Sequence, residues 1–132
     1  MEPKILIADD EAHIRLLLER TLLDFEDEGV EILMADNGED TMEIIRTEKP
    51  ALVFLDVMMP KMNGFDVCHA VKNELGLEDV YIVMLTAKGQ EFDKRRGEEV
   101  GADIYITKPF DPDEIYDKAE EVLGLWNLRS ED

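Results

Sequence analysis

Five short apolar runs alternate along this chain with segments of helical periodicity, and this alternation restricts the possible folds more than any other feature. The runs are rich in β-branched residues and span Ile5–Ala8, Glu31–Ala35, Leu52–Leu55, Val80–Leu85 and Ile104–Ile106. Short, continuously apolar runs are typical of strands buried on both faces of a parallel sheet. Because helical segments separate the runs, the sequence predicts an α/β fold in which each strand is followed by a helix.

The helical segments show apolar residues spaced three or four apart, with recognisable residues at their ends. The expected helices span residues 14–25, 39–48, 64–75, 90–100 and 111–124. The last one should begin at Asp111-Pro112-Asp113-Glu114, which has the N-cap, N1 proline and N3 glutamate of a helix start, and should end at Gly124. A chain of 132 residues suits a single domain. We assign it residues 1–124, followed by a short C-terminal tail, residues 125–132.

The charge and the absence of long apolar stretches limit the partners and the location of the chain. Acidic residues outnumber basic ones by 33 to 14, which gives a net charge of −19. Such a surface repels phosphate groups, so we expect no direct contact with nucleic acid and none with a membrane. No apolar stretch approaches the roughly 20 residues of a membrane helix. The single cysteine, Cys68, cannot form an internal disulfide and is expected to be a small buried residue. These features predict a cytoplasmic protein.

The ends of four of the five predicted strands carry residues that could take part in chemistry. They are Asp9-Asp10-Glu11, Asp56, Thr86 and Lys108. Ligands of parallel α/β sheets bind beyond the carboxyl ends of the strands, so these residues form the candidate site. If the first and third strands are neighbours, Asp9, Asp10 and Asp56 meet, and their repulsion requires either a protonated acid or a bound cation. Oxygen ligands without histidine or cysteine favour Mg²⁺ or Mn²⁺, although an Asp-Asp pair taken alone is equally typical of a solvated turn.

These motifs make the chain similar to the receiver domain of two-component response regulators, such as those of chemotaxis. The similarity runs from Lys4 to about Leu123 and includes Asp9-Asp10-Glu11, Leu55–Pro60, Asn63-Gly64, Thr86-Ala87 and Thr107–Phe110. The resemblance implies a flavodoxin-like, doubly wound (βα)5 fold with a five-stranded parallel sheet of order 2-1-3-4-5. It also implies a phosphoprotein of a two-component phosphorelay that acts as a stoichiometric phosphoacceptor and not as an enzyme.

The resemblance further implies which residues carry the chemistry. Asp56 would be the phosphoacceptor, taking a phosphoryl group from a sensor histidine kinase or a phosphotransfer protein. The implied ligands of Mg²⁺ are Asp9, Asp10, Asp56 and the backbone carbonyl of Met58. The phosphoryl group would be stabilised by Thr86, Ala87 and Lys108.

Other residues would shape the site or transmit its state. The loop-shaping residues implied are Pro60, Gly64 and Pro109, with a cis bond between Lys108 and Pro109. Thr86 and Tyr105 would form the switch, in which a shift of Thr86 allows the Tyr105 ring to turn inward. This would change the face made by the fourth helix, the fifth strand and the fifth helix, where an output partner binds. A half-buried Tyr105 with its hydroxyl in water is the alternative.

Two behaviours of the phosphorylated protein are also expected. Met58 and Lys88 would flank the path of a hydrolytic water without orienting it, which predicts slow autodephosphorylation. The acidic fifth helix predicts a monomer, because like charges repel across a two-fold axis.

Two functions of other classes compete with this interpretation. A phosphatase of the haloacid dehalogenase type needs an acid two residues after its nucleophile, but Met58 occupies that position. A flavin carrier of flavodoxin type needs a hydroxyl- and glycine-rich loop after the first strand, where Asp9–Ala12 would repel a phosphate.

Overall fold

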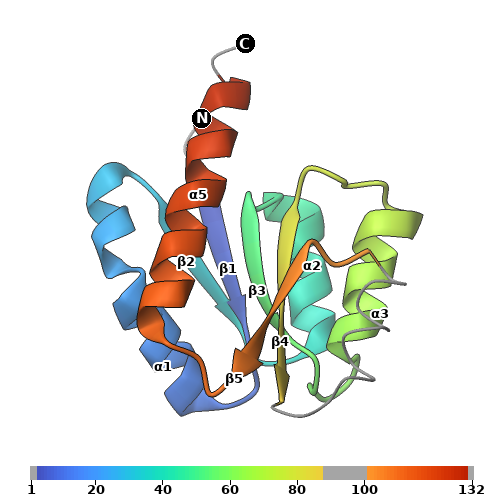
Figure 1. Cartoon of the computed structure of the whole chain (residues 1–132). Helices are drawn as coiled ribbons and strands as arrows, with labels where there is room; N and C mark the ends of the chain where they lie inside the picture. Colours follow the sequence, from blue (N-terminus) through green and yellow to red (C-terminus); the bar gives the residue numbers. More distant parts are fainter. Residues whose placement is uncertain (1–2, 88–100, 131–132) are drawn as a thin grey trace.

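The computed structural model describes residues 3–87 and 101–130 of the chain. Its strands are β1 (Lys4–Ala8), β2 (Glu31–Ala35), β3 (Leu52–Asp56), β4 (Tyr81–Ala87) and β5 (Ile104–Lys108). They form one parallel sheet in the order β2-β1-β3-β4-β5 (Figure 1). Each predicted run is a strand to within two residues at either end, and the flavodoxin-like fold class with its strand order is confirmed.

Helices cover both faces of this sheet. Those in the described residues are α1 (Ala12–Thr21), α2 (Gly38–Glu48), α3 (Gly64–His69) and α5 (Pro112–Ser130). Figure 1 shows α1 and α5 against one face and α2 and α3 against the other. The fourth expected helix, residues 90–100, lies outside the described residues. Among the described helices, none combines the length and the apolar character needed to span a membrane.

Alternate residues of each strand enter two separate apolar cores. In β1, Ile5 and Ile7 pack with α1 and α5, whereas Leu6 and Ala8 pack with α2 and α3. All four are fully buried. Burial on both faces explains why the strand runs are continuously apolar and do not alternate. Cys68 is fully buried in the core beneath α3, as expected.

Three helix ends differ from the sequence-based prediction. The first helix ends at Thr21 and is followed by a 3₁₀ segment, Leu23–Glu28, in which Phe25 still reaches the core. The third changes after His69 into a π turn, Ala70–Glu74. The expected end of the last helix at Gly124 was wrong, because α5 continues to Ser130. A glycine ends a helix when it adopts a left-handed conformation, as Gly29 does after the 3₁₀ segment and Gly76 does after the π turn, but Gly124 does not have a positive φ.

Candidate functional site at the carboxyl edge of the sheet

Asp9, directly after β1, is held by hydrogen bonds from the β1–α1 turn and from α1. Its side chain is fully buried, and its Oδ1 accepts a hydrogen bond from the Glu11 N–H at 2.9 Å. The Asp9 carbonyl accepts a bond from the Arg15 guanidinium of α1 at 2.8 Å. The next two acids, Asp10 and Glu11, are exposed. The β1–α1 turn therefore buries one carboxylate and leaves two at the surface.

Asp56, the last residue of β3, is the second buried acid. It is 5% exposed and pairs across the sheet with Leu85 of β4. Its Oδ1 accepts the Met58 N–H at 3.4 Å. Because β1 and β3 are neighbours, with Ala8 opposite Leu55, the acids that follow these positions lie at the same edge.

Lys108, the last residue of β5, connects the two buried acids. Its Nζ lies 2.8 Å from Asp9 Oδ2, 3.3 Å from Asp56 Oδ1 and 3.7 Å from Glu11 Oε1. The peptide bond between Lys108 and Pro109 is cis, as expected. A single ammonium group thus partly compensates a pair of buried carboxylates.

The pKa values reflect this incomplete compensation. Burial, reinforced by the charge of Asp9, raises the pKa of Asp56 from 3.8 to about 7, although Lys108 opposes the shift. Burial lowers the pKa of Lys108, but the hydrogen bond to Asp9 and the charges of Asp56 and Asp9 outweigh it and leave that pKa above its ordinary value. The negative charge of the two buried carboxylates therefore destabilises the folded protein when no cation is bound.

The acids are close enough to share a cation. Asp9, Asp10, Glu11 and Asp56 each place a carboxylate oxygen within 4.8 Å of the others. An all-oxygen set with two buried and two exposed members suits Mg²⁺ or Mn²⁺, which bind through few carboxylates and retain water. Met58, 72% exposed, lies beside this cluster through its N–H bond to Asp56. The residues present thus fit a hard divalent ion.

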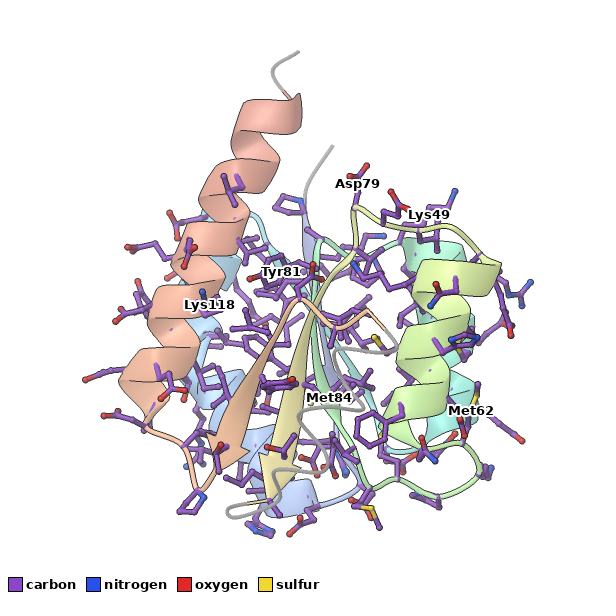
Figure 2. The ribbon with its side chains drawn as sticks, turned by 45° about the vertical axis from the view of Figure 1, so that its right-hand side comes forward. Lys49, Met62, Asp79, Tyr81, Met84 and Lys118 are labelled. Carbon is purple, nitrogen blue, oxygen red and sulfur yellow. The ribbon has the colours of Figure 1, made fainter. Side chains whose placement is uncertain are left out.

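Thr86 and Ala87 lie at the end of β4, at the same edge of the sheet. Thr86 is buried and comes directly after Leu85, the partner of Asp56, and Ala87 pairs with Lys108. Tyr105 of β5 is half-buried opposite Met84, which Figure 2 labels within the sheet. Since side chains two residues apart share a face of a strand, Thr86 and Tyr105 are diagonal neighbours on one face.

The model of the response regulator receiver domain family matches residues 5–120 of this chain. The chain belongs to the response regulator receiver domain family. This membership places it in two-component signalling and decides against the phosphatase and flavin-carrier alternatives.

The likeness extends to solved receiver structures. A putative response regulator from Chloroflexus aurantiacus is 31% identical with a TM-score of 0.82, covering 94% of this chain and 99% of that one. Chemotaxis protein CheY4 of Vibrio cholerae is 30% identical with a TM-score of 0.79, covering 92% and 99%.

Curated relatives of this receiver domain are transcriptional regulators by name. The probable transcriptional regulator ycf27 of Porphyra purpurea is 48% identical over 120 residues, which are 91% of this chain and 47% of that protein. The alkaline phosphatase synthesis transcriptional regulatory protein PhoP of Bacillus subtilis is 43% identical over 123 residues, 93% and 49% respectively. The chain spans about half the length of these relatives. Their names are at odds with the expectation of no direct contact with nucleic acid, an expectation based on the charge of this chain alone.

The structure shows contacts of Glu11 and Arg15 that the sequence analysis did not predict, although it placed Glu11 in the candidate site. Glu11 joins the acid cluster and approaches Lys108, and the only signal for it was its place in the run of three acids. Arg15 supports the Asp9 carbonyl from α1, and nothing in the sequence pattern distinguishes it from other surface arginines.

Gly64, a predicted loop-shaping residue, donates its N–H to the Val57 carbonyl at 2.8 Å, and a Cβ there would collide with the Asp56 carbonyl. Pro60 is exposed in the same loop.

Proposed function

We propose that this receiver domain accepts a phosphoryl group on Asp56 from the phosphohistidine of a sensor kinase or a phosphotransfer protein. The observation that carries the proposal is the pairing of Asp56, buried at the end of β3, with Lys108 and Asp9 beside two exposed acids. A buried carboxylate with a fixed cation on one oxygen and an open acidic side toward solvent can act as a nucleophile. Family membership supports the same role.

The transfer exchanges one bond to phosphorus for another. A carboxylate oxygen of Asp56 attacks phosphorus, an acyl phosphate O–P bond forms, and the N–P bond to imidazole breaks. The imidazole leaves with the electron pair and binds a proton from solvent. The product is a mixed anhydride on Asp56, with one phosphoryl group per chain, so the domain is consumed stoichiometrically and does not turn over substrate.

Charge is the main obstacle to this reaction, because an anionic donor must approach a group of carboxylates. Asp9, Asp10 and Asp56 would hold Mg²⁺ together with the Met58 carbonyl, and Glu11 is close enough to orient its water shell. When bound, the ion supplies positive charge that offsets these carboxylates and the incoming phosphoryl group.

Lys108, Thr86 and Ala87 would stabilise the phosphoryl group once it is attached. Lys108 already lies 3.3 Å from Asp56 Oδ1, so its ammonium can pair with a phosphoryl oxygen after a small movement. The Thr86 hydroxyl and the Ala87 N–H come from the end of the neighbouring strand and can donate hydrogen bonds.

We infer that the phosphoryl group alters the surface around β5 and α5. A movement of Thr86 toward the phosphoryl group would free space on the face that Tyr105 shares, so that the ring could turn inward. Because relatives bear the names of transcriptional regulators, we propose that the output of this domain is the control of transcription. We also propose that the protein is located in the cytoplasm.

The experiment is intact-mass measurement after incubation with acetyl phosphate and Mg²⁺. The wild type should gain one phosphoryl mass, which hydroxylamine removes. Asp56→Asn, or a chelator added before the donor, should abolish the gain. Asp117→Asn, which removes an exposed acid of α5, is the matched control and should be modified like the wild type. A phosphoryl mass that persists in Asp56→Asn would contradict the assignment.

A further inference from the structure

The loop that follows Asp56 is pressed against the N-terminus of α2 at Gly38. The Gly38 N–H donates to the Pro60 carbonyl at 3.2 Å. A Cβ on Gly38 would lie 2.5 Å from the Met62 Cβ and closer still to the Met62 carbonyl oxygen, which is less than any Cβ tolerates. Figure 2 shows Met62 beside α2 and α3. Only glycine fits between the helix and this loop.

The loop is strained where Gly38 contacts it. The Met62 N–H donates to the Pro60 carbonyl at 2.8 Å, and Lys61 between them has a φ of 70°. A three-residue turn with a positive φ at its centre is rare and strained for a residue other than glycine. Such a conformation persists when its surroundings hold it. Here the Gly38 N–H binds the same carbonyl that closes the turn.

The α2 side of this contact is anchored by hydrogen bonds between buried residues, so we expect a displacement to fall on the loop. Asn37 caps α2 by accepting the Asp40 N–H at 2.9 Å, and its carbonyl accepts the Thr41 hydroxyl at 2.7 Å. Asn37 and Thr41 are buried. By contrast, Met58, Pro60 and Lys61 of the loop are exposed. Added bulk at Gly38 would therefore push the loop and not the helix.

We propose that Gly38 is a positioning residue for the phosphoacceptor site, an inference that rests on the function proposed above. By seating α2 on Pro60 and Met62, it holds the loop whose Met58 N–H contacts Asp56 and whose Met58 carbonyl would face the ion. Mg²⁺ requires near-ideal octahedral geometry, so a loop displaced by a few tenths of an ångström binds it poorly. Gly38 thus acts on the chemistry through the loop without touching the reacting atoms.

The test compares three glycine substitutions in the full chain by titration calorimetry with MgCl₂ and by the rate of phosphorylation with acetyl phosphate. Gly38→Ala should weaken Mg²⁺ binding about tenfold and slow phosphorylation in parallel, because the ion's ligands are misplaced. Gly76→Ala is the control for lost stability. Gly76 has a φ of 67° with no atom within 4 Å of a Cβ, so alanine strains the backbone away from the site, and Mg²⁺ affinity should stay within twofold of the wild type. Gly124→Ala, also with open space around its Cβ, should leave both readouts unchanged.

Asn37→Ala is measured beside these variants in case Gly38→Ala does not fold. This substitution removes the N-cap of α2 and so loosens the first turn of that helix, without adding an atom against the loop. It should weaken Mg²⁺ binding about threefold. If the folded variants among Gly38→Ala and Asn37→Ala bind Mg²⁺ as tightly as Gly76→Ala does, the positioning role is overturned. A wild type that neither binds Mg²⁺ nor accepts a phosphoryl group would instead overturn the proposed function, and the inference with it.

Discussion

Replacing Asp56 by asparagine should stabilise the metal-free protein at neutral and alkaline pH. Asp56 is buried beside Asp9, and the pKa of its carboxyl is raised from 3.8 to about 7. Each pKa unit corresponds to about 1.4 kcal/mol, so ionising this carboxyl costs the folded state about 4 kcal/mol. An amide carries no charge but does not reproduce every hydrogen bond of the carboxyl. We therefore expect the substitution to raise the free energy of unfolding by about 2 kcal/mol, half of this cost.

The gain depends on pH in a direction set by the raised pKa. When the folded-state pKa of an acid lies above its unfolded value, folding favours the protonated form. The penalty is therefore absent below about pH 4, grows as the pH rises, and is complete above about pH 7. The wild type should lose stability relative to Asp56→Asn between pH 5 and pH 8.

The assay is thermal unfolding followed by circular dichroism in EDTA. Asp56→Asn should melt about 7 °C above the wild type at pH 8, and by less than half of that at pH 5. Asp117→Asn makes the same change in net charge at an exposed position of α5, so it should shift the Tm by less than about 2 °C at either pH. Added Mg²⁺ should raise the Tm of the wild type more than that of Asp56→Asn. The reasoning is refuted if Asp56→Asn is less stable than the wild type at pH 8, or if its gain is the same at both pH values.

Four further outcomes are expected. Asp10→Asn should weaken Mg²⁺ binding about tenfold in calorimetry. It should raise the metal-free Tm by less than about 2 °C, because Asp10 is exposed, and a lower Tm than that of the wild type would contradict this. Lys61→Gly should add about 0.5–1 kcal/mol to the unfolding free energy in urea, since φ at this position is 70°, and a loss would show that the turn is not strained. Met58→Asn should shorten the lifetime of the phosphorylated form about threefold after removal of the donor, because an amide can orient a hydrolytic water; an unchanged decay would exclude that role. Light scattering should find a monomer before and after phosphorylation, since α5 is acidic and its Lys118 is already bonded to Glu121, and a tight dimer in moderate salt would contradict it.

Much of the site's composition can be predicted from local sequence, but its distances cannot. Apolar runs that end in acids place Asp9 and Asp56 at strand ends, because strand burial and strand direction are local properties. The contact between Lys108 and Asp9 joins residues 99 positions apart and depends on the strand order. The sequence placed Glu11 in the candidate site, but its approach to Lys108 could not be predicted for the same reason, because these residues lie far apart along the chain.

The sequence by itself determined the alternation of strands and helices, the caps such as Asp111, and the identity of the charged groups at the sheet edge. These follow from spacing, propensity and capping, which act over a few residues. Only the tertiary structure decided that α5 continues through Gly124, that Asp56 carries a raised pKa, and that Gly38 lies against Met62. The physical reason is that burial, electrostatic coupling and steric exclusion depend on which distant segments pack together, and packing is set by the whole sheet rather than by any one segment.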